Sequence, residues 1–149
     1  MENYQQTQEQ PYVSNAPVAQ LKTNRGLLKT ILLSLITFGI YGVAVYAGIG
    51  NDTNIVCSRY DGKKTMSYWL MFFLITPITL GIGLLVWTHK LYNRIGNELK
   101  RRQIDYSLSA GTFWGWTILG SLIIIGPFVA THKLMVASNK INADFNVKG

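Results

Sequence analysis

Three long stretches of the chain carry no formal charge at neutral pH, and this distribution constrains the fold more than any single motif. The uncharged windows run over residues 30–51, 65–89 and 106–132, and each is longer than 20 residues. An α-helix rises about 1.5 Å per residue, so each window can cover a hydrocarbon core roughly 30 Å thick. A helix in a soluble core has no need of such length. The windows therefore predict an all-α integral membrane fold.

The charged residues are concentrated at the edges of these windows. The chain has 14 Lys and Arg against 7 Asp and Glu, which gives a net charge of +7. Basic residues beside a membrane segment gain on the order of 1 kcal/mol each near an anionic lipid surface. We therefore expect the lipid bilayer, and its anionic headgroups in particular, to be the partner rather than nucleic acid.

Residues 1–24 have a different composition from the rest of the chain. They contain five Gln and two Pro with few large apolar side chains, which is too little apolar surface to offset the entropy of ordering. This stretch is predicted to be a disordered tail before a single membrane domain over residues 25–149. It lacks the three-part pattern of a secretory signal, so the first window is expected to stay in the mature protein.

An internal repeat of about 42 residues divides that domain. Thr-x-Gly-Ile occurs at residues 37–40 and again at residues 79–82, while Thr-His-Lys-Leu occurs at residues 88–91 and 131–134. Repeats of this period indicate stacked copies of one supersecondary unit. The three predicted units comprise residues 25–63, 64–105 and 106–149.

Breaks inside the windows leave two arrangements open. Gly39, Pro77, Gly81 and Pro127 interrupt the apolar runs, and Pro removes a backbone donor and clashes with the preceding turn. Each window forms either a kinked helix that crosses the bilayer or a shallow helical hairpin that turns at Thr-x-Gly-Ile. In either case an amphipathic exit helix follows, which can lie along the headgroups.

The basic residues give a weak preference for orientation. If all three windows span, eight Lys and Arg lie on one side and six on the other. Because the cytoplasmic side carries the excess of basic residues, we expect a multi-pass protein of the cell membrane with a cytoplasmic amino terminus. Charge on every flank is unusual for alternating spans and keeps the hairpin alternative open.

Two segments resemble a known family. Leu-Ile-Thr-Phe-Gly-Ile-Tyr at residues 35–41 and Ile-Thr-Leu-Gly-Ile at residues 78–82 resemble the repeats of a bacterial membrane family known as domain of unknown function 4234. Phe-Trp-Gly-Trp at residues 113–116 resembles the closing segment of such chains. The resemblance extends over roughly residues 25–145 and implies a membrane fold, but it carries no activity to transfer.

Residues near the ends of the windows are expected to anchor the chain at the membrane surface. Aromatic rings and the aliphatic stems of Lys both favour the headgroup level. The expected interface anchors are Trp69, Trp87, His89, Lys90, His132 and Lys133. Neither His has a second His or a carboxylate three or four residues after it, so no metal site is predicted.

The small residues Gly111 and Gly115 form a Gly-x-x-x-Gly pattern that allows close packing between membrane helices. No nucleophile, phosphate-binding or metalloprotease motif occurs, so neither catalysis nor a cofactor is expected. We therefore predict a non-enzymatic membrane module that associates with itself or with other membrane proteins. The alternative is a small channel or transporter component, and an enzyme acting on lipid, resting only on the two histidines, comes third.

Overall fold

The computed structural model describes residues 19–149, which are helical apart from turns and three extended segments, with no strand in that range. In chain order the helices are α1 (Leu27–Ile36), α2 (Ile40–Asp61), α3 (Tyr68–Leu70), the π-helical turn η1 (Met71–Ile75), α4 (Thr76–Ile78), α5 (Ile82–Arg101), α6 (Ala110–Phe113), the π-helical turn η2 (Trp114–Ile118), the 3₁₀ helix η3 (Leu119–Ile123) and α7 (Gly126–Lys148). The all-α prediction is confirmed. None of these helices combines the length and the apolar character needed to cross a bilayer.

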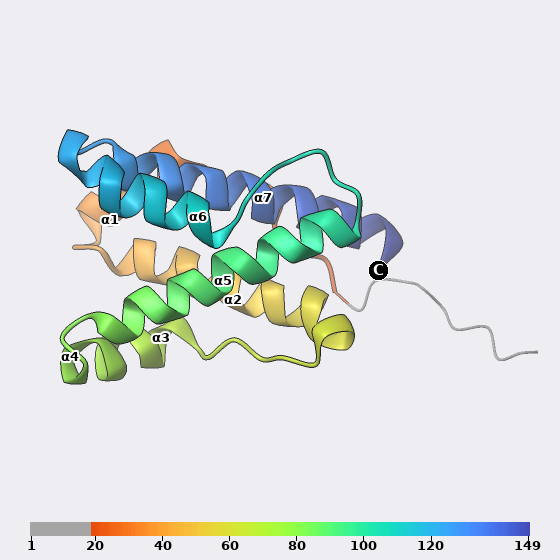
Figure 1. The fold of residues 1–149 in the computed structure, drawn as a ribbon, viewed down its shortest axis with the longest axis horizontal. Helices are drawn as coiled ribbons and strands as arrows, with labels where there is room; N and C mark the ends of the chain where they lie inside the picture. Colours follow the sequence, from red (N-terminus) through yellow and green to blue (C-terminus); the bar gives the residue numbers. More distant parts are fainter. Residues whose placement is uncertain (1–18) are drawn as a thin grey trace, which may run out of the picture.

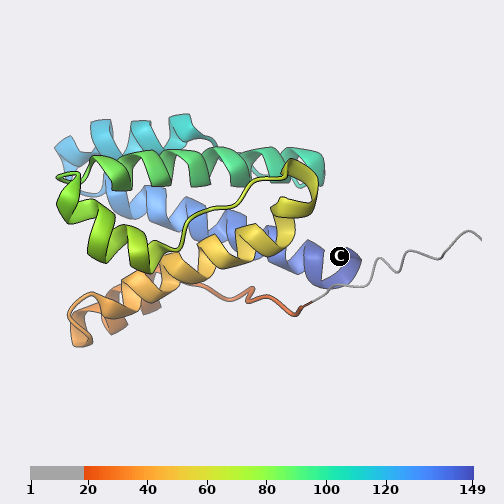
Figure 2. The same ribbon diagram turned by 90° about the horizontal axis from the view of Figure 1, so that it is seen from below.

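Each predicted repeat unit contains one helical hairpin, made of a short arm, a turn and a long helix. Hairpin 1 comprises α1 and α2, hairpin 2 runs from α3 to α5, and hairpin 3 runs from α6 to α7. All three turns lie at the same end of the molecule, on the left of Figure 1, and the view from below in Figure 2 agrees. The backbone thus follows the hairpin arrangement and not the arrangement of three continuous kinked helices.

Glycine is required at the first two turns by backbone conformation. Gly39 and Gly81 have φ of 88° and 89°, a left-handed conformation that glycine adopts without steric penalty. The residues before them, Phe38 and Leu80, also have positive φ, at 52° and 50°. Two successive left-handed residues reverse the chain, so the turn occurs at Thr-x-Gly-Ile in both units.

The threonine of that motif joins the two arms of the hairpin. Thr37 Oγ1 donates to the carbonyl of Leu33 at 2.7 Å and accepts from the N–H of Tyr41 at 3.0 Å. Thr79 makes the same two bonds, four residues back and four residues on, at 2.7 and 2.9 Å. Helix ends leave backbone groups without intrahelical partners. The hydroxyl satisfies the N–H group that follows each turn, while the carbonyl to which it donates already accepts the threonine's own N–H. The turn can therefore be made with otherwise apolar side chains.

The three long helices form the core. Every pair among α2, α5 and α7 is in contact, and their facing side chains are apolar and fully buried. The largest of these are Ile49 and Val56 from α2, Leu91, Tyr92, Ile95 and Leu99 from α5, and Leu134, Met135 and Phe145 from α7. The short arms pack around this core in cyclic order, α1 on α7, α3 on α2 and α6 on α5. Each hairpin is therefore held by its neighbour.

Extended segments dock on the long helices by backbone recognition. Asn54 on α2 donates to the carbonyl of Thr65 at 2.8 Å and accepts from its N–H at 2.6 Å. Asn139 on α7 binds the backbone of Arg25 in the same way, at 2.8 and 3.1 Å. One amide side chain thus satisfies both backbone groups of a residue that is in no helix.

The first extended segment begins earlier than the sequence predicts. Leu21 is buried, and both its backbone groups are hydrogen-bonded to Asn146 at 2.7 and 2.8 Å. Asn142 donates to the carbonyl of Lys22 at 2.7 Å. Residues 19–24 of the predicted disordered tail are therefore held against α7. The α7 residues that hold them lie more than 110 residues later in the chain. The rest of the predicted tail lies outside the described residues.

On α5 a glycine takes the place of the asparagine. Gly96 lies at the repeat position of Asn54, 42 residues on, and of Asn139, 43 residues before it. A Cβ at Gly96 would overlap with the carbonyl oxygen of Leu108, in the extended segment before α6. Backbone is packed directly on backbone here, and no side chain fits between them.

We predict that Gly96→Ala destabilises the fold by about 1–3 kcal/mol, because the added methyl group forces α5 away from the segment before α6. The measurement is thermal or denaturant unfolding in detergent. Gly115→Ala is the matched control, since open space surrounds that position and Ala has the higher helix propensity. Equal stability of the two variants would contradict the close approach at Gly96.

Candidate functional site

The most unusual surface of the molecule lies at the three turns. Phe38, Leu80 and Ile124 are 97, 92 and 78% exposed, each in the turn between the two arms of a hairpin. All three have positive φ, between 50° and 60°, a conformation that is uncommon for any residue with a bulky side chain. Strained backbone of this kind marks functional positions when nothing in the packing explains it. Neither burial nor backbone preference accounts for large apolar residues at these points.

Further apolar side chains extend this surface around each turn. The tip surface comprises the three turn residues together with exposed neighbours on both arms, namely Leu35, Ile36, Ile40, Ile78, Ile82, Leu119, Leu122, Ile123, Ile125 and Phe128. Soluble monomers rarely expose contiguous apolar surface of this kind, and where they do it marks a contact with a membrane or a protein. The tip surface is therefore the first element of the candidate site.

Three lysines stand at a common distance from the turns. Lys29 precedes Phe38 by nine residues, Lys90 follows Leu80 by ten, and Lys133 follows Ile124 by nine. At about 1.5 Å per residue, this places them roughly 13–15 Å from the tips. No Asp, Glu, Lys or Arg lies closer to a turn along the chain. The molecule thus has an apolar end with a basic boundary.

The predicted interface anchors lie in different environments. Trp69 and His132 are exposed, as is Lys90, while Lys133 places its Nζ 5.8 Å from the centre of a tyrosine ring. His89 is half-buried and accepts a hydrogen bond at Nδ1 from Nε1 of Trp114 at 2.9 Å. No three His, Cys, Asp or Glu side chains of residues 19–149 gather into a metal-binding group.

Trp87, unlike the other predicted anchors, is buried in the core. Its side chain is only 4% exposed, its ring lies tilted against that of Tyr68 at 4.8 Å between ring centres, and its Nε1 donates to the carbonyl of Met66 at 2.8 Å. The indole packs between hairpins 1 and 2 because the short arm of hairpin 2 folds back over α5. A position at the end of an apolar window could not reveal that return of the chain.

The predicted packing glycines have no close neighbour in the described chain. Around a Cβ at Gly115 there is open space, and at Gly111 only the side chain of Ser109 comes near. The glycines at which the backbone of another segment approaches closely are Gly96, Gly120 and Gly126. Packing at Gly111 and Gly115 remains a prediction about contact with another molecule.

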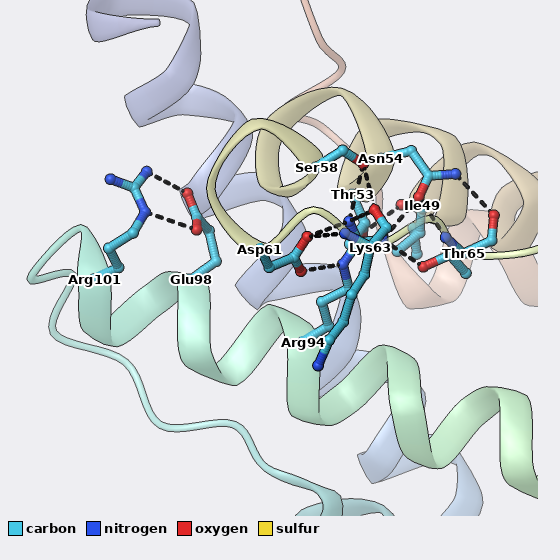
Figure 3. A network of polar contacts seen from close by, with 10 residues as sticks. All are labelled: Ile49, Thr53, Asn54, Ser58, Asp61, Lys63, Thr65, Arg94, Glu98 and Arg101. Carbon is cyan, nitrogen blue, oxygen red and sulfur yellow. Dashed lines mark hydrogen bonds and ion pairs between the residues drawn. The ribbon is translucent and has the colours of Figure 1, made fainter.

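The opposite end of the molecule is polar and is organised by Arg94. This buried side chain is clamped to Asp61 by two bonds, from Nε at 2.6 Å and from Nη2 at 3.0 Å. Its other N–H groups donate to Asn54, Thr65 and Ser58 and to a backbone carbonyl, at 2.6–3.0 Å. Figure 3 shows these groups converging on the guanidinium from α2 and the segment that follows it.

The sequence did not identify Arg94 as a site residue. In the structure its guanidinium is fully engaged in contacts within the protein. A buried ion pair is stable only when its remaining donors are also satisfied, and six bonds meet that condition. Arg94 and Glu98 lie four residues apart on α5, a spacing that favours an ion pair between them. Glu98 is instead paired with Arg101 and Arg102, each at 2.6 Å.

Further polar contacts connect the hairpins at this end. Arg102 on α5 contacts Asp144 on α7 at 2.7 Å, and Arg25 before α1 contacts Asp52 on α2 at 2.7 Å. Asn142 on α7 donates to the same carboxylate at 2.7 Å. These contacts tie all three hairpins together where they lack the apolar tip surface.

A cleft of about 1020 Å³ runs along α5 between the two ends. At its tip side the lining is apolar and includes Met71, Ile82 and Val86. At its polar side it is lined by charged groups, among them Lys63, Lys64, Lys90, Arg94 and Arg101. The volume is at the upper end of the range for small-molecule sites.

Burial and nearby charges shift the pKa values of two groups in this region. Burial opposes ionisation of Asp61, but hydrogen bonds from Arg94 and from the N–H of Lys63 lower its pKa below the usual value. Burial raises the pKa of the Cys57 thiol to about 12, aided by the nearby Glu98 carboxylate. Asp61 is therefore ionised, and Cys57 is a buried thiol without nucleophilic character at neutral pH.

Comparison with known proteins gives one match. Residues 25–97 match the family described as domain of unknown function (DUF4234), which confirms the family that the repeats resemble. The match covers hairpin 1 and most of hairpin 2 and carries no activity. Searches of curated proteins and of solved structures found no significant match.

The charge state of Asp61 predicts how stability depends on pH. Because the pKa of Asp61 is lowered in the folded protein, its ionised form stabilises the fold. This stabilisation is fully present above the pKa of an unfolded Asp, about 3.9, and is lost as the pH falls through the lower pKa of the folded state. In Asp61→Asn, the melting temperature should be lower at neutral pH, and the difference from wild type should shrink below about pH 4. Melting curves across this range check it.

Asp105→Asn is the control, since no ion pair of Asp105 with another described residue is present. It should follow the wild-type profile. A difference between Asp61→Asn and wild type that stays constant down to pH 2 would contradict the assignment.

Proposed function

We propose that this chain, whose residues 25–97 match the DUF4234 family, is a non-enzymatic membrane module whose three hairpin turns enter one leaflet of a bilayer. The single observation that carries this proposal is the tip surface. Phe38, Leu80 and Ile124 lie at the three turns and are 97, 92 and 78% exposed. In an apolar phase that exposure becomes favourable, by about 2 kcal/mol for each of the three side chains.

The depth of the apolar end supports entry into a single leaflet. Lys29, Lys90 and Lys133 lie roughly 13–15 Å from the tips, which is about half of a 30 Å hydrocarbon core. Their ammonium groups would reach the headgroups when the tips reach the middle of the bilayer. Thr37 and Thr79 support the same depth, because their hydroxyls satisfy turn backbone groups that would otherwise lie unpaired in hydrocarbon.

This arrangement also changes how the basic residues are distributed between the two sides of the membrane. With hairpins, both ends of the chain and every segment between hairpins lie on one side of the membrane. All 14 Lys and Arg then share that side, instead of dividing eight against six. Because basic residues favour the cytoplasmic face and its anionic lipids, we propose a cell-membrane protein with its amino terminus and its loops in the cytoplasm.

The tip surface can be tested by vesicle binding. The triple variant Phe38→Ser, Leu80→Ser, Ile124→Ser should bind phosphatidylcholine vesicles about 100-fold more weakly or worse, because three apolar side chains leave the hydrocarbon. Flotation with liposomes measures the partition. Val147→Ser is the matched control, since Val147 is 79% exposed but lies at the polar end. Equal binding of the triple variant and wild type would refute the proposal.

The side of the membrane from which each loop is accessible distinguishes hairpins from spanning helices. Single cysteines at Lys64, Asp105 and Val147, in a Cys57→Ser background, should all react with an impermeant reagent from one side of sealed vesicles. Spanning helices would place position 105 opposite the other two. Reaction of Asp105→Cys from the opposite side would therefore favour crossing helices.

Self-association at the open glycine face is a second part of the proposal. Gly115 has open space around it, and Trp114 and Trp116 beside it are exposed, so this face is available for another copy of the chain. Disulfide crosslinking of Gly111→Cys in the Cys57→Ser background should give a dimer in membranes, and Lys100→Cys should not. Similar dimer yields from both positions would count against this face.

The channel or transporter alternative stays a prediction. Reconstituted protein that moves ions or solutes across liposomes would favour it over a module that lies in one leaflet. No feature of the described residues leads us to prefer it.

A further inference from the structure

We infer that the cleft along α5 binds one anionic phospholipid, with its headgroup at Lys63, Lys64 and Lys90 and an acyl chain toward the tip surface. This inference rests on the proposed insertion into a leaflet and adds a specific site to it. Three features of the cleft support it: its direction, its charge and its position relative to the proposed membrane surface.

The direction of the cleft follows one face of α5. Lining residues recur along the helix from Ile82 at the turn to Arg101 at the last helical position. At about 1.5 Å per residue this face is roughly 28 Å long. The side chains at its turn end are apolar, whereas charged groups occupy the far end. A ligand that matches this lining has an apolar tail and a charged head.

The lysines of the cleft that form no ion pair indicate which charge the ligand's headgroup carries. Among the described residues, Lys63, Lys64 and Lys90 form no ion pair, and all three are exposed at the cleft. The two arginines of the lining are already engaged, Arg94 with Asp61 and Arg101 with Glu98. Three unpaired ammonium groups favour an anion, and phosphate oxygens are strong acceptors for Lys.

The position of the cleft identifies the source of that anion. Its apolar end opens beside Ile82, which belongs to the tip surface, and Lys90 lies at the proposed headgroup level. A lipid of the same leaflet could therefore enter the cleft with its chain and head at their usual depths. A soluble phosphate compound would leave the apolar half of the cleft, around Met71 and Val86, without an occupant.

Lipid binding by the purified full-length chain tests the site. Detergent-solubilised protein is incubated with phosphatidylglycerol or phosphatidylcholine, and bound lipid is counted by native mass spectrometry. Wild type should retain one phosphatidylglycerol and bind phosphatidylcholine at least about tenfold more weakly. Lys63→Gln, Lys64→Gln, Lys90→Gln should lose this preference. The charge-matched control Lys22→Gln, Lys100→Gln, Lys140→Gln, outside the cleft, should keep it.

A second variant tests the apolar half without changing any charge. Val86→Trp fills the cleft at an exposed position and should reduce phosphatidylglycerol retention at least about tenfold, with the melting temperature as the check on folding. If both triple lysine variants lost the preference for phosphatidylglycerol equally, the preference would come from general charge attraction. That result would overturn the proposed site. Displacement of the lipid by excess inorganic phosphate would reduce it to an anion site and also overturn the proposal.

These outcomes are separate from those of the proposed function. Flotation of the Lys63, Lys64 and Lys90 variant with phosphatidylcholine vesicles should equal wild type, because the tip surface is unchanged. If wild type floats but retains no phosphatidylglycerol, the cleft proposal fails and leaflet insertion stands. If wild type does not float, insertion itself fails.

Discussion

The separation of charge from the three turns is the constraint on which the rest of the structure depends. Along the chain, the nearest charged groups to the tips are Lys29, Lys90 and Lys133. Every ion pair between described residues forms beyond them, toward the ends of α2, α5 and α7. One end of the molecule can therefore be apolar while the other holds a dense polar network. An even distribution of the same charges would allow neither.

At each end of the molecule, side chains form hydrogen bonds with backbone groups that have no partner within a helix. At the tips, Thr37 and Thr79 bridge the arms of their hairpins, so that the reversal of the chain leaves fewer backbone groups without partners. At the polar end, Arg94 and the asparagines of α2 and α7 satisfy the backbone and side chains of extended segments. Such segments gain no support from helical hydrogen bonds, and the side-chain contacts fix them against the core instead.

The cyclic packing explains why three similar units form one body. Each short arm packs on the long helix of another hairpin, so no hairpin buries its apolar face alone. The order closes because α1, at the start of the chain, packs on α7 at its end. Hairpin 3 keeps this arrangement although it lies outside the family match and turns without the Thr-x-Gly-Ile motif. The shared core, rather than the turn sequence, is what the units have in common.

The sequence by itself determined the helical class, the three units and the turn positions in the first two of them. These properties depend on local chemistry: uncharged windows, glycine at left-handed positions and threonine beside it. It could not determine that Trp87 is buried, that residues 19–24 are held by α7, or that Arg94 is enclosed by α2 and the segment after it. Those features require contacts between residues far apart in the chain. Only the return of each hairpin to the same end brings them together, and the same return gathers Phe38, Leu80 and Ile124 into one surface.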